Sequence, residues 1–422
     1  MASAAMENFV MNVRTLSNQG NFNELNEFLG KNMEVLVRNP AHLSTALETL
    51  DIQQHSLGVL AVMSAKLQQS QITDWDDLFN RLTVFIKDCN GEQIRYAAQS
   101  FAELCHLFAD QLIKKNTPLV GMSSLIKAIS KIQMSEKCLT SVHADVVRLA
   151  LASKCFTKPI IDLLDVNYNE IAREASVNPK SLLLFFYYGG MISTATKNYQ
   201  RALYFFEACV TMPSLAVSHI MMEAYKKYIL VWLILHGEQS QDALSFPKYT
   251  SPVVNKYVRP LCSPYHEIVK AFYSSQHSEL ANVMEKYNNI FSEDGNSGLV
   301  NQVVVARKRT SIKRLTKTFL TLSLEDVAAR VGLTSPQEAE RQLVGMIEDG
   351  SIFAAISQKD GMVRFHTNPE KYNSVKMLRK LECDVENLIS LDSHIAAMDE
   401  EITVNPKYVK MCGSAGAAGG QR

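Results

Sequence analysis

The side chains that most often perform catalysis or bind metals are scattered through this chain. Its 10 histidines and 8 cysteines occur singly, with no C-x-x-C pair, no H-E-x-x-H and no H-x-H followed by serine and aspartate. A zinc site needs ligands at such short spacings. Cys105 and His106 are neighbours, but on a helix they would point about 100° apart, so they would make a poor nucleophile and base. We predict buried core positions for both and no metal centre.

Phosphate-binding and hydrolase motifs are also missing from the sequence. Gly189 and Gly190 lack the G-x-x-x-x-G-K-[ST] or G-x-G-x-x-G context of a phosphate loop, and no G-x-S-x-G sequence occurs. The sequence therefore predicts no catalytic residue, no cofactor-binding residue and no cofactor. An independent catalytic role is the least favoured alternative.

Composition points to protein partners inside the cell. Lys plus Arg equals Asp plus Glu at 43 each, so the summed charge gives no general attraction to nucleic acid or to a membrane. The widely spaced cysteines are typical of reduced, mostly buried thiols. The first residues show no secretory signal, and the longest apolar runs fall short of the ~20 residues that span a bilayer. We expect a protein of cytoplasm and nucleus that does not bind membranes.

Residues 307–366 carry the clearest fold signal. Ile312, Leu315, Phe319 and Leu322 recur at spacings of three and four, which predicts an amphipathic helix. A second helix follows the Ser323 cap and ends at Gly332, and a third begins at the Ser335–Pro336 pair and ends before Gly350. Residues 352–356 and 362–365, joined through Asp360–Gly361, predict a hairpin. Three helices and a hairpin make a winged helix.

Charge on this winged helix argues against DNA. The third helix, which often enters the major groove, carries Glu338, Glu340, Glu348 and Asp349 against Arg341 alone. Basic residues gather on the first helix instead, at Arg307, Lys308, Arg309, Lys313, Arg314 and Lys317. We interpret them as a solvated or acid-facing flank, with nucleic-acid contact as the alternative. The winged helix is predicted to bind protein.

Helical periodicity dominates the chain before the winged helix. Breaks at intervals of roughly 15 to 25 residues favour paired antiparallel helices stacked as a solenoid over residues 1–195. Phe186, Gly190, Tyr199, Ala202 and Phe206 resemble a tetratricopeptide unit weakly, and an ordinary helical hairpin fits them as well. Helices continue through residues 196–300, including a long run from 218 to 237 that is apolar on more than one face and is predicted to be buried. The winged helix is assigned residues 301–367.

A final helix is predicted over residues 370–404. Its apolar residues follow a near-heptad spacing, the pattern of a helix whose seam needs other helices: Leu378, Leu381, Val385, Leu388, Ile395, Met398 and Ile402. A partner within the chain is one alternative, and a bundle shared with other chains is the interpretation we prefer. Residues 405–422 read as a Gly/Ala-rich disordered tail.

This order of elements resembles the PCI family, whose members build the proteasome lid, the signalosome and a translation initiation factor complex. To about residue 406 the chain resembles the signalosome members in particular. The segments that carry this resemblance are residues 55–62, 90–96, 187–191, 218–230, 247–250, 314–324 and 347–350. The implied fold is mostly α, with a TPR-like helical-repeat solenoid, a PCI winged-helix subdomain and a C-terminal bundle helix.

The resemblance implies a non-catalytic scaffold in a complex of eight subunits that removes the ubiquitin-like protein Nedd from cullin-RING ubiquitin ligases. Its partners would be the other subunits and, through the complex, the ligases. In the family, winged helices pack edge to edge and the terminal helices form one bundle. The edge contact would fall on Ile352, Phe353, Ile356, Met362, Val363 and Phe365, whose hairpin could be extended by another strand. The bundle contact would fall on the seam from Leu378 to Ile402.

The alternative function is a PCI scaffold or nucleic-acid adaptor of another complex, such as the proteasome lid, translation initiation or RNA export. An adaptor would use Arg307 to Lys317 and bind with steep salt dependence. Nucleic acid is not the expected partner.

Overall fold

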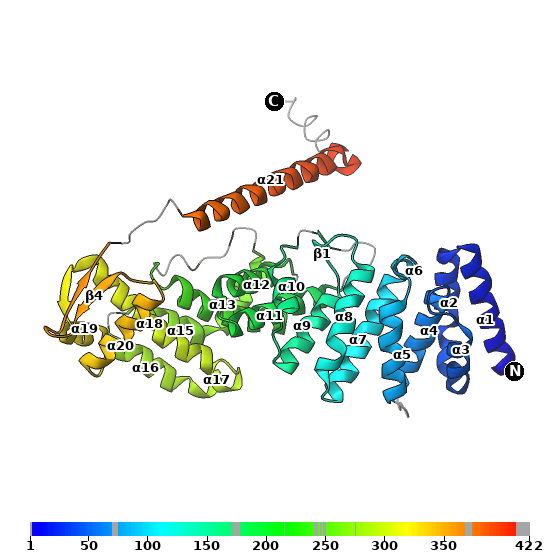
Figure 1. Cartoon of the computed structure of the whole chain (residues 1–422), viewed down its shortest axis with the longest axis horizontal. Helices are drawn as coiled ribbons and strands as arrows, with labels where there is room; N and C mark the ends of the chain where they lie inside the picture. Colours follow the sequence, from blue (N-terminus) through cyan, green and yellow to red (C-terminus); the bar gives the residue numbers. More distant parts are fainter. Residues whose placement is uncertain are drawn as a thin grey trace. The chain divides into compact units, whose positions relative to one another are not determined.

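The computed structural model describes residues 2–69, 75–168, 170–171, 178–214, 216–239, 244, 247, 250–274, 276–367 and 374–410. The fold is mostly α-helical (Figure 1). It divides into two compact units: the first is Met1–Leu315 with Ala329–Leu333, and the second is Thr316–Ala328 with Thr334–Arg422.

The first unit begins with a series of helical repeats. Their helices are α1 (Ala2–Gln19), α2 (Phe22–Arg38), α3 (Leu43–Thr49), α4 (Ser56–Leu67), α5 (Trp75–Asp88), α6 (Gly91–Tyr96), α7 (Ala98–Lys114), α8 (Pro118–Ile132), α9 (Val142–Ser153) and α10 (Lys158–Asp165). Two short strands, β1 (Cys138–Leu139) and β2 (Glu170–Ile171), pair in parallel beside them. The unit continues with α11 (Pro179–Ala195), α12 (Tyr199–Thr211), α13 (His219–His236), α14 (Arg259–Leu261), α15 (Ser263–Tyr273), α16 (His277–Lys286), α17 (Asn288–Glu293) and α18 (Ser297–Thr318).

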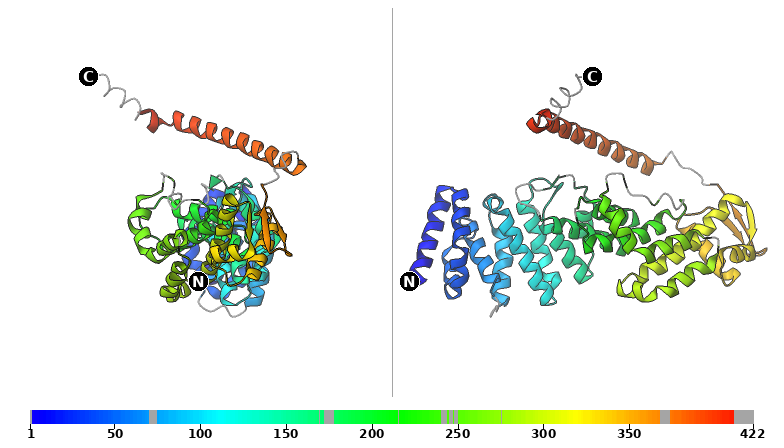
Figure 2. Two further views of the ribbon diagram at one scale, coloured as in Figure 1. Left: turned by 90° about the vertical axis from the view of Figure 1, so that its left-hand side faces the viewer. Right: turned by 180° about the vertical axis from the view of Figure 1, so that it is seen from behind.

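Stacking follows the solenoid pattern. The helices α2, α4, α7, α9, α11 and α13 each contact the next one in that order, and α5 and α8 pack beside this row. Figure 2 shows the amino-terminal helices standing side by side along the unit. Buried apolar side chains form two clusters, one from Met6 through Phe205 and the other from Ala202 through Val303. Each helix pair thus covers the apolar face of its neighbour, as repeat architectures require.

The hairpin of α11 and α12 shows why two glycines stand in an otherwise apolar helix. A Cβ atom on Gly190 would lie 2.6 Å from Cε1 of Phe206, and one on Gly189 would lie 3.1 Å from Cδ2 of Leu164. The glycines therefore permit a close approach of the neighbouring helices. The predicted burial of the run from 218 to 237 is also confirmed, because α13 buries residues on all its faces, from Met221 to Leu233.

The second unit holds the winged-helix strands. They are β3 (Thr321–Ser323), β4 (Ala354–Ser357) and β5 (Met362–Phe365), with α19 (Leu324–Val331) and α20 (Pro336–Glu348) between β3 and β4. The strands form an antiparallel sheet in the order β3-β5-β4. A last helix, α21 (Val375–Val404), follows.

Helix ends in the winged helix follow the predicted punctuation. The Ser335 hydroxyl accepts a hydrogen bond from the Glu338 amide at 3.2 Å, and the Ser323 hydroxyl accepts one from the Asp326 amide at 3.0 Å. Gly332 and Gly350 have φ angles of +75° and +66°, a conformation that glycine adopts at helix ends without a steric penalty.

The first predicted helix of the winged helix is wrong in its extent. It starts ten residues before Arg307, at Ser297, and ends at Thr318, so Phe319 and Leu322 are not helical. Leu322 lies in β3, is buried and pairs with Val363. Strand pairing buries Leu322 as well as a helical face would, so helical spacing alone could not distinguish the two.

The segment predicted as a disordered tail, residues 405–422, is helical near its start. Residues 406–410 form a helical turn. Residues 411–422 lie outside the described residues.

Candidate functional site

The predicted bundle seam is an exposed apolar face on α21. The Ser374 hydroxyl accepts a hydrogen bond from the Met377 amide at 3.2 Å and starts the helix. All seven predicted seam residues are exposed, from 48% for Met398 to 67% for Leu378. A helix that keeps so many large apolar side chains in water is typical of one that packs against a partner.

The apolar face of α21 is broader than predicted. Ile389 and Leu391 are also exposed, at 62% and 49%, and they flank Leu388 on the same side of the helix. Ile389 comes one residue after Leu388, and Leu391 comes one residue before the next core position of the heptad. This spacing was the signal in the sequence that both residues border the seam. Burying a Leu or Ile side chain gives about 1.5–3 kcal/mol. A surface with this many such residues can hold a stable complex together.

The structure corrects the predicted edge of the winged helix. β5 lies between β3 and β4, so its backbone is paired on both sides. Ile352, just before β4, is buried at 4%, and Val363 and Phe365 are buried at 0% and 5%, because the alternation of β5 turns those two toward the unit's own core. Of the predicted edge residues, Phe353 and Ile356 are half-buried and Met362 is 39% exposed.

The sheet has two edge strands, β3 and β4, and β4 is the one that contains predicted edge residues. The Phe365 amide donates to the Leu320 carbonyl at 2.8 Å, on the β3 side, and Phe365 stands opposite Ala354. The His366 amide donates to the Phe353 carbonyl at 2.8 Å. Antiparallel strands alternate in this way, so the backbone groups of Ala354 and Ile356 point away from β5. They are the groups that an added strand would pair with.

Cys105 and His106 do not act as a pair. Cys105 is fully buried, and burial raises the pKa of its thiol well above the usual range. His106 is exposed, which contradicts its predicted core position. Its Nδ1 lies 2.8 Å from Oδ1 of the buried Asp145 on α9, and this hydrogen bond raises the pKa of His106. The contact ties α7 to α9 and leaves the thiol without a base.

A half-buried cluster of charges in the first unit also has a structural role. Lys226 Nζ lies 2.7 Å from both Glu223 and Asp294, and Asp294 accepts a further hydrogen bond from the Tyr265 hydroxyl at 2.7 Å. Together they join α13, α15 and the turn before α18. Among the residues that the structure describes, no group of His, Cys, Asp and Glu could hold a metal ion. In the same part of the chain, no helix is long and apolar enough to cross a membrane.

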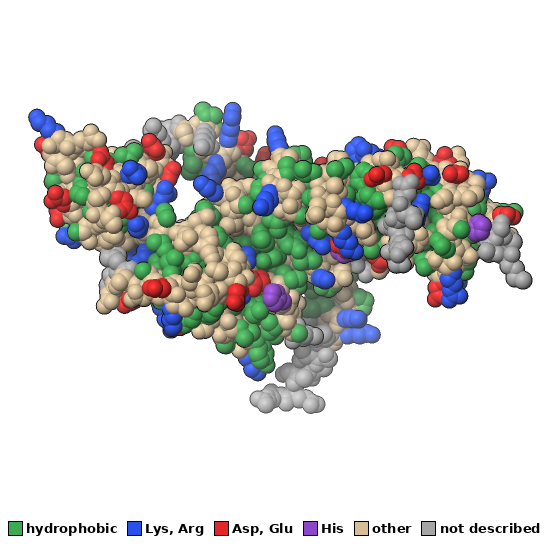
Figure 3. All heavy atoms as spheres, turned by 90° about the horizontal axis from the view of Figure 1, so that it is seen from below, with side chains coloured by type: hydrophobic (Ala, Val, Ile, Leu, Met, Phe, Trp, Pro, Cys, Tyr) green, Lys and Arg blue, Asp and Glu red, His purple; other side chains and the backbone are tan. Residues whose placement is uncertain are grey.

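Arg307 and Lys313, two of the basic residues on α18, make contacts within the first unit. Arg307 is 7% exposed and donates from Nη2 to the carbonyls of Ser274 and Gln276, each at 2.9 Å. Lys313 pairs with Glu238 at 2.9 Å. On the face drawn in Figure 3, acidic and basic side chains are interspersed. This arrangement is typical of a protein-binding surface more than of a phosphate-binding one.

Comparison with known proteins agrees with this architecture. Residues 19–254 match the family model for the N-terminal helical repeats of COP9 signalosome complex subunit 3, and residues 284–367 match the PCI domain. The chain is 43% identical over 425 residues to COP9 signalosome complex subunit 3 of Drosophila melanogaster, covering 96% of this chain and 94% of that protein. It is 35% identical over 384 residues to the subunit of the same name from Dictyostelium discoideum, covering 90% of each.

Proposed function

Because the chain belongs to the COP9 signalosome complex subunit 3 family, we propose that it is a non-catalytic scaffold subunit of a signalosome. The complex would have eight subunits and remove Nedd from cullin-RING ubiquitin ligases in cytoplasm and nucleus. In this role the chain supplies surfaces that hold other subunits, and the chemistry belongs to a different subunit.

The exposed apolar face of α21 is the observation that carries this proposal. It extends from Leu378 to Ile402 on one 30-residue helix. Apolar residues at heptad spacing stabilise a helix only when other helices bury them. We assign the bundle contact to this seam and a second, smaller contact to the β4 edge.

The double substitution Leu388→Asp with Ile395→Asp tests the bundle contact. Two charges in the seam should leave the monomer folded, because both side chains are already exposed, and should prevent co-purification with the other subunits. Burial of an unpaired carboxylate costs several kcal/mol, so we expect the loss to be complete at ordinary protein concentrations.

A matched control lies on the opposite face of the same helix. Cys383→Asp with Ser390→Asp adds the same two charges at the same spacing of seven residues, but about half a turn away from the seam. This variant should assemble normally. Equal assembly of the seam variant and the control would overturn the bundle assignment.

The nucleic-acid adaptor alternative has no comparable support. Arg307 and Lys313 are engaged within the first unit, and α20 carries an acidic residue, Glu338, in its first turn. If the purified chain bound RNA at low salt and lost it on replacing Lys313, Arg314 and Lys317 with Glu, this alternative would replace the scaffold proposal.

A further inference from the structure

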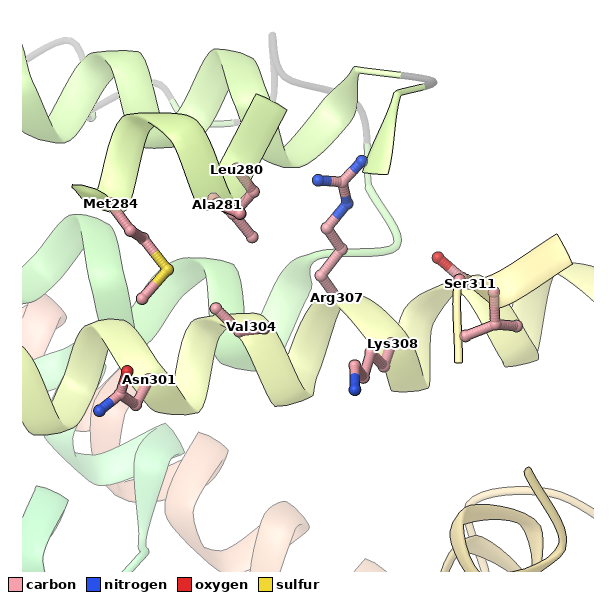
Figure 4. A pocket seen from close by; sticks show the side chains of 10 residues that line it. Leu280, Ala281, Met284, Asn301, Val304, Arg307, Lys308 and Ser311 are labelled. Carbon is pink, nitrogen blue, oxygen red and sulfur yellow. The ribbon is translucent and has the colours of Figure 1, made fainter. Parts of the chain in front are cut away.

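A cavity beside the basic helix α18 has no part in the contacts assigned above. Its volume is about 390 Å³, within the range of pockets that bind small ligands or inserted side chains. It lies between α16 and α18 and reaches Val331 and Gly332, all of which belong to the first unit. Figure 4 shows Met284 extending from α16 toward α18, and Arg307 rising from α18 toward the level of α16.

The walls of this cavity differ in chemistry. Leu280, Ala281 and Met284 of α16, with Val304 of α18, form an apolar wall. The next positions along α18 are basic, at Arg307 and Lys308. A ligand that fills the cavity would therefore bury an apolar group against Val304 and α16. It would place an anionic group beside Arg307 and Lys308.

Arg307 is held in place by hydrogen bonds within the fold, and one of its nitrogen atoms makes no hydrogen bond to a described residue. Its Nη2 serves two backbone carbonyls, which fixes the side chain. Its Nη1 is buried and has no hydrogen-bond partner among the described residues. An unsatisfied buried donor on a charged group is unfavourable, and a carboxylate from a ligand would satisfy it with a charge-assisted hydrogen bond.

The charge around the cavity favours an anion. Between Ser297 and Thr318, α18 has six Lys and Arg residues and no acidic residue. Glu279 of α16 offsets part of this charge, since it stabilises the charged form of Arg307. Lys313 is paired with Glu238 at 2.9 Å, so the positive charge nearest a ligand in the cavity is that of Arg307 and Lys308, which acts over about 10 Å at ordinary ionic strength.

We propose that this cavity binds an acidic amphipathic segment of a partner protein. An apolar side chain of the segment enters between α16 and α18, and a neighbouring carboxylate faces Arg307 and Lys308. The apolar wall favours a peptide over RNA, whose phosphates would gain nothing from Leu280, Met284 or Val304. This surface is additional to the scaffold role, because it uses neither the β4 edge nor the α21 seam.

Photo-crosslinking in the assembled protein tests the proposal. A photoreactive phenylalanine analogue in place of Ser311, which lines the cavity, should crosslink to a protein segment. Mass spectrometry of the crosslinked peptide should show an apolar residue next to Asp or Glu. The same analogue at Leu388 of α21 verifies that crosslinking works in each preparation.

Two pairs of variants show whether the cavity itself is responsible. Ala281→Trp fills the cavity, and Asn282→Trp adds the same side chain at the next, exposed position of α16. Lys308→Glu reverses a charge in the cavity lining, and Lys317→Glu does so outside it. We expect the crosslink yield to fall about tenfold for Ala281→Trp and Lys308→Glu and to stay unchanged for the two controls. Changing the mapped carboxylate to Lys should restore the crosslink to Lys308→Glu.

Several outcomes would overturn the proposal. They are a crosslink to RNA, a crosslink to a segment without an acidic residue, a yield insensitive to Ala281→Trp, and no intermolecular crosslink from Ser311 while Leu388 crosslinks. Circular dichroism of each variant separates these outcomes from misfolding, and co-purification through α21 shows that the scaffold role is intact.

Discussion

At the scale of single residues, the packing of the repeats leaves no room for extra atoms at some positions, and Gly190 is the clearest case. Gly190→Ala would place a Cβ atom 2.6 Å from the Phe206 ring. The core has to shift, so we expect a loss of about 1–3 kcal/mol in the free energy of unfolding, measured by urea denaturation of the full chain. Gly30 is the control, since it lies within α2 and a Cβ atom there meets nothing within 4 Å. Gly30→Ala should stabilise by up to about 1 kcal/mol. Equal effects of the two would contradict the packing argument.

Burial of His143 is predicted to make the stability of the repeats fall at acidic pH. It is 1% exposed, its Nδ1 accepts from the Thr140 amide at 3.1 Å, and burial lowers its pKa from 6.5 to about 4. The folded state therefore resists protonation more than the unfolded state does. The contribution of neutral His143 to stability is complete above pH 6.5 and is lost as the pH falls toward about 4. The loss is on the order of 3 kcal/mol.

His143→Asn isolates this effect, because the amide oxygen can accept the same hydrogen bond without titrating. At neutral pH the variant should be less stable by roughly 1–2 kcal/mol, through lost contacts with Tyr168 and Phe185. Denaturant unfolding of both proteins should show this gap closing and then reversing as the pH falls through the window above, because the loss of about 3 kcal/mol exceeds the gap. A gap that is constant with pH would mean that His143 is not the titrating group.

At the scale of elements, the β4 edge and the α21 seam are the two surfaces that we propose as contacts with other subunits. Ala354→Pro removes a backbone N–H that points away from β5, which an edge strand tolerates. We expect the winged helix to keep its melting temperature and its contact with a neighbouring subunit to weaken by about tenfold, the effect of losing one well-placed hydrogen bond. Pull-down titration of the purified subunits measures this. Ala354→Val keeps the N–H and should bind normally, and binding of the proline variant equal to that of the valine variant would rule out pairing at β4.

The elements differ in how far the sequence could predict them. The caps at Ser323 and Ser335 act within four residues, so local spacing was enough to place α19 and α20. The seam of α21 could be predicted equally well, because it depends only on the spacing of residues within one helix. No tertiary contact among the described residues covers it. β3 was missed because Leu322 is buried by pairing with Val363, some forty residues later, and that contact leaves no local periodicity. The same missing strand is the reason that β5 was mistaken for part of the edge.

Individual side chains show the same limit within the candidate sites. The exposure of Leu388 and Ile395 follows from the helix alone, whereas the burial of Val363 and Phe365 depends on which strand lies in the middle of the sheet. The cavity beside α18 needs α16 and the end of α19 together, so Arg307 could be recognised in the sequence only as one of a group of basic residues. Its bonds to Ser274 and Gln276 are tertiary contacts that no spacing predicts.

For the molecule as a whole, the helical repeats come first, and the β4 edge and the α21 seam, which we propose as the assembly contacts, both follow residue 350. Helical repeats match residues 19–254, and the PCI domain over 284–367 follows them. The largest exposed apolar surface of the described residues lies on α21. We therefore expect assembly to depend on the last helix while folding of the repeats does not.

Native mass spectrometry of the complex purified through another signalosome subunit tests this dependence most directly. The full chain and a chain ending at residue 410 should both appear in the complete assembly, because each retains α21 (Val375–Val404). A chain ending at residue 374 should be folded by circular dichroism and absent from the assembly. Recovery of that shorter chain in the complete complex at the level of the full chain would contradict the account, since it would show that α21 does not hold this subunit in place.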